Sequence, residues 1–587
     1  MTAKESPVAP VGSVLRRRPI LLEVGVVTIG LTTLPLLVSN FRLGLVAGYL
    51  GLAIMAIGLD LVWGYTGILS IGQAAFFGTT TYVTAILIQQ LGWSPLPAAI
   101  AGIAASLALA GVVSGFVFFS SVGPFFVAII TLALGVLLEQ VVNQFSTITG
   151  GFNGIVLSDF GPPTTVGRYA LSAVVAVIAL AVAAIVASSD FGRTMRAVRD
   201  DEKRLQFLGY RVPLIKTIVF VGGALFAAIG GLVFIVDTQY VSASNIGFTL
   251  STEVIIWTAI SGRGTIIGPF LGAIGISVLG QSLSGSIVEY WQLALGTILL
   301  LIIVFAPDGL YPPVRRRLGV KYREPRHIRS RAMPEFEGHA AALQVAHVSK
   351  RFGKLTAVDD VSFALQQGEI VCLVGPNGAG KSSLINSMTG TYPPNDGSVT
   401  VGDFSLVGRS PDEIARRGVI RTFQTTRLFD GLDVFENMFL AARAGTIRLI
   451  DLSRRSTIVE VPRHVGEFLR TGGLDDRLDD SPPQLSHGLR QWLELCMAMA
   501  AGSRLLLLDE PTAGLTNQER AAVGSTLRQL TSGDDVGLLL IEHDLEFVSR
   551  LANTVLVMHQ GRLVASGSVS EVASDPFVRQ IYLGVSS

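Results

Sequence analysis

The chain has 587 residues, of which 50% are hydrophobic and only 15% are charged, and its formal net charge is +1. Soluble domains usually carry about 25% charged residues, so this composition excludes an ordinary soluble protein over the whole length. No basic stripe with interleaved aromatic side chains occurs, so nothing indicates nucleic acid as a partner. Apolar runs dominate up to about residue 310, and soluble composition begins near residue 343. The sequence therefore predicts a multi-domain protein, with an N-terminal α-helical polytopic membrane domain and a C-terminal soluble domain.

Residues 1–18 form a polar cytoplasmic tail that ends in three arginines, and an apolar run follows from Pro19 to Val38. We interpret this run as a membrane span and not as a signal peptide, because no small-residue cleavage site follows and further apolar runs come at once. The length needed to cross hydrocarbon predicts roughly eight to ten spans within residues 19–311. The other candidates are 43–62, 68–90, 97–119, 124–145, 169–188, 215–236, 250–262, 265–283 and 287–306, of which 250–262 is short enough to be re-entrant.

Lysine and arginine placement predicts the orientation of these spans. The arginine tail, the loop at 190–216 and the arginines at 315–317 are all expected on the cytoplasmic side. Six spans before the loop and four after it satisfy this expectation, as do eight spans in total. The soluble domain then lies in the cytoplasm, attached to a multi-pass membrane domain, and the family resemblance described below implies the inner membrane.

Polar and small residues inside the apolar runs are candidates for function. The frequent glycines fit close helix packing, and they equally fit broken helices that line a pathway. Asp60, Glu139 and Glu253 are predicted to face the interior of the bundle, because a carboxylate in a span is costly. Asp60 and Glu253 also fit the ends of spans.

The loop at 190–216 places apolar side chains among charged ones at helical spacing. A solvated surface helix near anionic membrane lipids is one interpretation. The other is a coupling helix that carries motion between the two domains. Beyond the last span, residues 312–342 are rich in Arg, Pro, Glu and His and lack apolar periodicity, so we predict a cytoplasmic linker without a packed core.

The strongest local signal is the glycine-rich stretch at 375–382, which has a glycine, four residues and then Gly-Lys-Ser. It follows the apolar run 370–374, which is typical of a buried strand. Its backbone N–H groups turn inward on a polyphosphate, Lys381 reaches the terminal phosphates, and the Ser382 hydroxyl is a Mg²⁺ ligand. The pattern predicts an α/β P-loop domain over residues 343–587. The predicted contacts to the bound group are Gly375, Pro376, Asn377, Gly378, Ala379, Gly380, Lys381, Ser382 and Ser383.

Two later apolar runs end in residues suited to phosphate chemistry. Residues 505–508 lead into Asp509, predicted to hold Mg²⁺ through water, and Glu510, predicted to polarise an attacking water. Residues 538–541 lead towards His543, which is predicted to touch the terminal phosphate. A lone histidine is more often structural, but its position after the other parts favours the functional interpretation.

Four further residues complete the predicted site. Gln424 is predicted to bring its amide to Mg²⁺ and to the coupling surface. Ser486 and Gly488 stand at the start of an apolar-periodic helix, whose N-terminus suits a phosphate. Phe352 precedes the glycine-rich stretch and is predicted to stack on an adenine, the alternative being a strand-end aromatic without that role. The cysteines, Cys372 and Cys496, do not make a disulfide framework and fit a reducing compartment.

These residues together resemble the ATPase domain of ABC transporters over nearly all of residues 343–584. The resemblance implies ATP and Mg²⁺ as cofactors and ATP hydrolysis as the reaction. It also implies that two such domains close head to tail, so that Ser486 and Gly488 bind nucleotide held by the partner's phosphate loop. One departure is Thr516 in the D-loop, where the family usually has Asp.

Further motifs narrow the resemblance. Arg421-Thr422-Phe423-Gln424, Glu436-Asn437 and Ile581-Tyr582-Leu583-Gly584 look like the ATPases of branched-chain amino acid and urea importers. Residues 45–310 resemble the permease of the same systems. The chain is thus similar to a permease fused to its ATPase. The resemblance implies a second half, either another copy or distinct subunits, and an extracytoplasmic binding protein that delivers a small polar solute.

The solute is predicted only from secondary motifs. Several look more like the urea and short-amide branch than the branched-chain amino acid branch, which gives a weak lean to the former. They are Phe207-Leu208-Gly209-Tyr210, Ile256-Trp257, Gly262-Arg263-Gly264-Thr265 and the surroundings of His487 and Gln491. The alternative functions are an exporter half-transporter, whose helices would reach far into the cytosol, and a membrane-anchored ATP-dependent regulator.

Overall fold

The computed structural model describes residues 19–120, 122–158, 160–283, 291–317, 325–331, 343–532 and 536–583. The arginine tail at 16–18 and Gly584 lie outside these residues. Two compact units are formed: the first contains the chain up to Arg199, Pro213–Glu324 and Leu449–Arg455, and the second contains Asp200–Val212, Pro325–Arg448 and the chain from Ser456. Asp200–Val212 was predicted within the membrane domain but belongs to the second unit. Leu449–Arg455 was predicted within the ATPase domain but belongs to the first unit.

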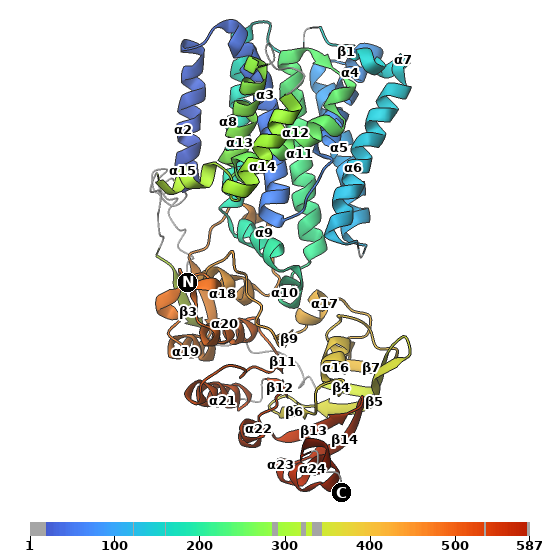
Figure 1. Cartoon of the computed structure of the whole chain (residues 1–587), viewed down its shortest axis with the longest axis vertical. Coiled ribbons are helices and arrows are strands. Elements are labelled where there is room, and N and C mark those ends of the chain that lie inside the picture. Colours follow the sequence, from blue (N-terminus) through green and yellow to red (C-terminus); the bar gives the residue numbers. More distant parts are fainter. Residues whose placement is uncertain are drawn as a thin grey trace, which may run out of the picture. The chain divides into compact units, whose positions relative to one another are not determined.

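Apolar helices build the first unit (Figure 1), and each of the ten predicted apolar runs contains one. They are α2 Pro19–Thr33, α3 Asn40–Leu59, α4 Gln73–Leu91, α5 Pro95–Phe118, α6 Pro124–Gln144, α8 Thr165–Ala187, α11 Val212–Thr238, α12 Phe248–Ser261, α13 Ile267–Leu283 and α14 Trp291–Phe305. Among the described residues, five helices are long and apolar enough to cross a membrane, namely α3 with the turn after it, α5, α6, α8 and α11. Helix α12 has only 14 residues, in line with the short run predicted there.

Helix α3 lies at the centre of this unit. The apolar stretch of α3 and the turn after it is 83% buried, compared with 22% for that of α5, and α3 contacts α8, α12 and α13. Gly51 of α3 faces Gly230 of α11 so closely that an added Cβ would lie 2.6 Å from the Gly230 carbonyl oxygen. For this pair of glycines the structure favours the packing interpretation, since small residues let helices approach.

Two sheets organise the second unit. The larger has the order β14-β13-β6-β12-β11-β9, and it is parallel except for the antiparallel edge strand β14. Its strands are β6 Ile370–Val374, β9 Val419–Arg421, β11 Leu505–Asp509, β12 Gly537–Ile541, β13 Thr554–His559 and β14 Arg562–Gly567. The smaller, antiparallel sheet has the order β5-β4-β7-β8 and contains β4 Leu343–Phe352, β5 Leu355–Leu365, β7 Asp396–Val401 and β8 Phe404–Ser405.

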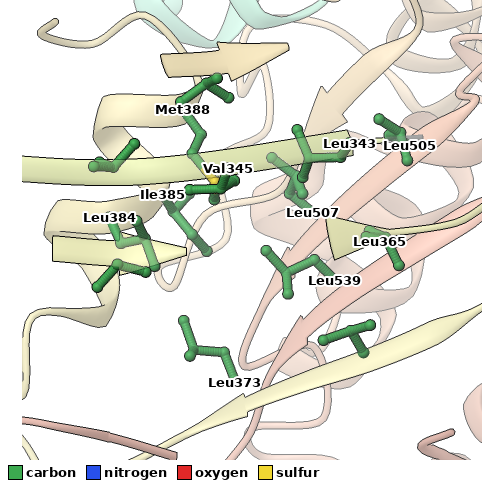
Figure 2. Packing of buried hydrophobic residues seen from close by; sticks show 14 of the residues in the cluster. Leu343, Val345, Leu365, Leu373, Leu384, Ile385, Met388, Leu505, Leu507 and Leu539 are labelled. Carbon is green, nitrogen blue, oxygen red and sulfur yellow. The ribbon is translucent and has the colours of Figure 1, made fainter. Parts of the chain in front are cut away.

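Helices surround these sheets. They are α16 Lys381–Met388, α17 Pro411–Ala415, α18 Val434–Arg443, α19 Arg463–Thr471, α20 His487–Ala500, α21 Asn517–Thr531, α22 Leu545–Leu551, α23 Val569–Ser574 and α24 Pro576–Leu583. Figure 2 shows the core where the two sheets meet α16, with Val345 of β4, Leu384 of α16 and Leu507 of β11 packed together. Strands β6, β11 and β12 are buried at every position, as expected for parallel strands covered on both faces. Their carboxyl ends meet at one edge, where ligands bind in open α/β sheets.

The predicted linker is partly ordered. Residues 311–317 form α15, Tyr311–Arg317, and His327–Arg331 form β3, which pairs in parallel with β10, Ile458–Pro462. The prediction concerned a packed core, and β3 forms without one at its mostly exposed positions, because strand pairing relies on main-chain hydrogen bonds and needs no apolar periodicity. Arg326, directly before β3, forms an ion pair with Asp433, the N-cap of α18. Residues 332–342 lie outside the described part of the chain.

Candidate functional site

The glycine-rich stretch forms the turn between β6 and α16. Gly375 and Gly380 have φ values of 153° and 102°, a region that favours glycine. A Cβ on Gly380 would overlap the carbonyl oxygen of Ala357, so the close approach of β5 also requires glycine there. The Nζ of Lys381 donates hydrogen bonds to the carbonyl oxygens of Gly375 at 2.6 Å and Pro376 at 3.0 Å. The ammonium group is thus held inside the turn where a phosphate is expected.

Glu510 directly follows β11 and carries the predicted water-activating carboxylate. Its backbone is left-handed, with φ 50°, which is uncommon for a residue with a side chain and is typical of strained functional positions. The Nε2 of His543 lies 2.8 Å from its Oε1. The amide of Gln424 donates to the same oxygen at 3.4 Å. The structure therefore brings together three residues that are widely separated in the sequence.

Asp509, the last residue of β11, is positioned by β9 and its extension. Its N–H donates to the Thr422 hydroxyl at 3.2 Å, and its carboxylate lies 3.6 Å from the Arg421 guanidinium. Burial raises the pKa of Asp509, and the charge of Arg421 opposes this rise. Burial lowers the pKa of Lys381, and the nearby Glu510 and Asp509 oppose that fall. Acidic and basic side chains thus lie close together in the site, and each favours the charged form of the other against the effect of burial.

Lys381, Gln424, Asp509, Glu510 and His543 all line one cavity of about 520 Å³. Its walls include the phosphate loop from Asn377 to Ser383, and Gln424, Asp509, Glu510 and His543, all of which the sequence singled out, whereas the predicted Gly375 and Pro376 are not among the lining residues. Sequence reasoning missed further lining residues, which are Leu355, Thr356 and Ala357 of β5, Ile541 of β12, and Gln560 and Gly561 of the β13–β14 turn. No sequence motif marks these residues, because the packing of the strands around the phosphate loop places them in the cavity wall.

Phe352 is not among the residues that line this cavity. Its side chain is 44% exposed, and its ring contacts Tyr392 edge to face with centroids 5.1 Å apart. The ammonium of Lys350 lies 5.4 Å from the Phe352 centroid. The adenine-stacking role therefore stays a prediction, and Tyr392 is an aromatic neighbour that the sequence did not indicate.

Ser486 and Gly488 also lie outside the lining of this cavity. Ser486 is the N-cap of α20, and its hydroxyl accepts a hydrogen bond from the Leu489 N–H at 3.3 Å. Thr516, the departure in the D-loop, is the N-cap of α21 and forms a capping box with Glu519. A threonine suits an N-cap because its hydroxyl accepts from the first turn of the helix.

Part of the predicted coupling loop belongs to the second unit. Helix α10, Glu202–Phe207, contacts α17. The rings of Phe207 and Phe423 meet edge to face at 5.1 Å, and the Tyr210 hydroxyl donates to the Leu440 carbonyl at 3.1 Å. Phe423 immediately precedes Gln424, so α10 packs against the residue next to the cavity. Helix α10 is therefore packed within the second unit, and the coupling role of this segment stays a prediction.

Arg204 of this segment has no exposed surface. Its guanidinium lies 3.3 Å from the carboxylate of Glu494 on α20 and donates to the Arg421 carbonyl at 3.3 Å. The same Glu494 carboxylate accepts from the Phe423 N–H at 3.4 Å. Burial raises the pKa of Glu494 to about 7, and the charge of Arg204 opposes the rise. One buried ion pair thus connects the segment to β9 and to the helix that begins at Ser486.

Comparisons with known proteins cover both units. Residues 43–304 match the family profile of the permease component of the branched-chain amino acid transport system, and residues 358–513 match the ABC transporter profile. The high-affinity branched-chain amino acid transport ATP-binding protein LivG of Salmonella typhimurium is 34% identical over 250 residues, which are 41% of this chain and 97% of that protein. The chain belongs to the ABC transporter family.

In this ABC transporter a membrane permease domain is fused to a cytoplasmic ATPase domain, and ATP hydrolysis is coupled to transport. The ATP-binding protein BraF of Pseudomonas aeruginosa is 32% identical over the same share of the chain and 97% of its own length. A crystal structure of a nucleotide-free ATP-binding cassette is 27% identical with a TM-score of 0.36, and it covers 42% of this chain and 100% of that one. The predicted fold class, a helical membrane domain followed by an α/β P-loop ATPase domain, is confirmed.

Proposed function

We propose that this chain is one half of an importer in the inner membrane that takes up branched-chain amino acids at the expense of ATP. The observation that carries the proposal is the presence, in one chain, of a permease domain of that transport family and a cavity equipped for hydrolysis. The names of the similar ATP-binding proteins support the same solute class.

The cavity residues divide the chemistry of hydrolysis between them. Lys381 offsets the charge that develops on the terminal phosphate, and Glu510 accepts a proton from the attacking water. Gln424 and His543 both contact Oε1 of Glu510, at 3.4 and 2.8 Å, and so fix the position of its carboxylate. The in-line attack then needs little beyond positioning and charge.

The residues present fit Mg²⁺. The oxygens of Ser382, Gln424 and Asp509 line the same cavity, and hard cations prefer such oxygen ligands. The described residues include no cluster of three or more His, Cys, Asp or Glu for a metal, which agrees with an ion held mainly by one carboxylate and the substrate phosphates. When bound, Mg²⁺ would neutralise phosphate charge.

The motifs that favoured urea and short amides have other tasks in the structure. Phe207 and Tyr210 contact residues of the ATPase domain, and Gln491 hydrogen-bonds the Thr426 hydroxyl and the Pro511 carbonyl. Such positions need not contact a solute. Branched-chain amino acids are therefore the better-supported substrate, and urea or short amides are the second candidate.

A second half is part of the proposal. Ser486 and Gly488 do not line the cavity of their own chain, so a partner ATPase domain is the natural recipient of their helix N-terminus. An extracytoplasmic binding protein would deliver the solute to the permease side.

The test is the ATPase rate of the lipid-reconstituted complex with candidate binding proteins, each loaded with leucine, urea or a short amide. We expect stimulation by the leucine-loaded protein and none by the unloaded protein. Stimulation by a urea- or amide-loaded protein alone would move the chain to that branch. An ATPase rate that no loaded protein changes would favour the membrane-anchored regulator.

A further inference from the structure

Asp60 is an acidic residue that is completely buried in the first unit. It begins a π-helical turn, Asp60–Tyr65, that continues α3. Its carboxylate accepts hydrogen bonds from two backbone N–H groups, those of Gly264 at 2.5 Å and Ile266 at 2.8 Å. The carboxylate is thus satisfied by the connector between α12 and α13, residues 262–266.

This connector is strained. Ile266 has φ 62°, although a β-branched residue rarely adopts a left-handed backbone, and Gly262 has φ 113°. π-Helical turns and strained backbone persist only where the surroundings determine them, and they are frequent at functional sites. A Cβ on Gly64 would collide with the Asp60 carboxylate and the Gly264 backbone, so the turn and the connector are built against each other.

Two segments that continue into the second unit meet at this junction. Arg199 donates from its guanidinium to the Gly64 carbonyl at 2.8 Å, and the next residue begins the segment Asp200–Val212 of the second unit. On the other side, the Leu310 N–H donates to the Ile260 carbonyl at 3.0 Å. The chain then runs through α15 towards the linker strand β3.

We propose that Asp60 is a positioning residue for coupling ATP hydrolysis to transport. Its two backbone hydrogen bonds clamp the connector to the end of α3. A displacement that arrives through Arg199 or through residues 308–312 is therefore passed to α12 and α13 together. A carboxylate suits this task, because both of its oxygens accept and neither has to donate. This inference rests on the proposed importer function.

The test replaces the carboxylate by an amide in the full-length, lipid-reconstituted protein. Asp60→Asn keeps the shape but presents an NH₂ group to one of the two N–H donors. We expect basal ATPase activity to remain and the stimulation by loaded binding protein to fall by roughly 2- to 30-fold, the range of coupling effects along such networks. Asp237→Asn, which removes a carboxylate of the same unit outside the junction, serves as the matched control and should keep full stimulation.

A second variant covers the case in which Asp60→Asn fails to fold. Arg199→Gln removes one input to the junction, and the same loss of stimulation with basal activity retained is expected. Wild-type stimulation in a folded Asp60→Asn protein, or in Arg199→Gln when the first variant does not fold, would overturn the proposal. If the wild-type protein itself is not stimulated, the importer function fails instead, so the two failures are distinguishable.

Discussion

At the residue scale, the central group is Glu510, whose left-handed backbone places its carboxylate between Gln424 and His543. We expect Glu510→Gln to bind ATP normally and to lose hydrolysis by about 10²- to 10⁴-fold, because the amide cannot accept a proton from water. The variant should therefore accumulate in an ATP-loaded form. Hydrolysis of labelled ATP, with nucleotide occupancy measured in parallel, gives both values.

The matched control for that variant is Glu467→Gln, which neutralises an exposed acid of α19 that pairs with Arg463. Its hydrolysis rate should equal that of the wild-type protein. Hydrolysis at the wild-type rate in Glu510→Gln would remove Glu510 from the reaction.

The two cysteines give a second prediction at this scale. Both are buried, and burial raises the pKa of Cys372 to about 12 and also raises that of Cys496. At pH 8 the thiolate of Cys372 is then on the order of one part in 10⁴, and the thiolate is the reactive form. N-ethylmaleimide should leave the native protein unlabelled and should label both thiols after denaturation, as mass spectrometry can show. Rapid native labelling at pH 8 would contradict the buried placement.

At the element scale, α10 is held by the buried pair of Arg204 and Glu494. Breaking a buried pair leaves an uncompensated charge and costs about 3–5 kcal/mol. We expect Arg204→Ala to lower the thermal stability of the protein and to reduce the stimulation of its ATPase. The exchange Arg204→Glu with Glu494→Arg should recover part of both losses, which a double-mutant cycle quantifies.

The exposed pair of Arg463 and Glu467 is the matched comparison, since 83% of the arginine side chain is accessible. Arg463→Ala should change stability by less than about 1 kcal/mol. Equal losses from the buried and the exposed pair would show that Arg204 does not anchor the helix.

Sequence patterns predicted elements well where one principle dominates. Each of the ten long apolar runs contains a helix among the described residues, because hydrocarbon imposes length and composition. The glycine-rich turn between β6 and α16 was predictable, because its glycines allow the positive φ values that such a turn requires. Strand β3 was not predictable, because its pairing with β10 uses main-chain groups that leave no side-chain pattern.

For single side chains, the position was predicted in some cases, but the bonding partners were not. His543 was predicted at the terminal phosphate and Gln424 at Mg²⁺, and the structure brings both to the Glu510 carboxylate, because parallel strands deliver their ends to one edge of the sheet. Asp60 was expected to face the interior of the bundle, and only the structure shows that backbone N–H groups of a distant connector satisfy it. The role of a buried charge depends on partners that sequence distance conceals.

At the scale of the whole molecule, the proposed second half supplies what one chain lacks at its cavity. Ser486→Arg should abolish hydrolysis in the assembled complex while leaving ATP binding to the individual chain intact, because Ser486 does not line its own cavity. Fluorescent nucleotide binding and phosphate release measure the two properties. Ser549→Arg, on the surface of α22, should affect neither. Hydrolysis at the wild-type rate in Ser486→Arg would argue against a shared site.

The central claim is that ATP hydrolysis by this chain drives a solute inward. The most direct measurement is uptake of labelled leucine into proteoliposomes that enclose ATP, with the binding protein added outside and Glu510→Gln as the inactive reference. We predict leucine accumulation in the lumen that requires enclosed ATP and is absent from the Glu510→Gln vesicles. Leucine movement away from the ATP-containing side, or ATP hydrolysis without any leucine movement, would contradict the account.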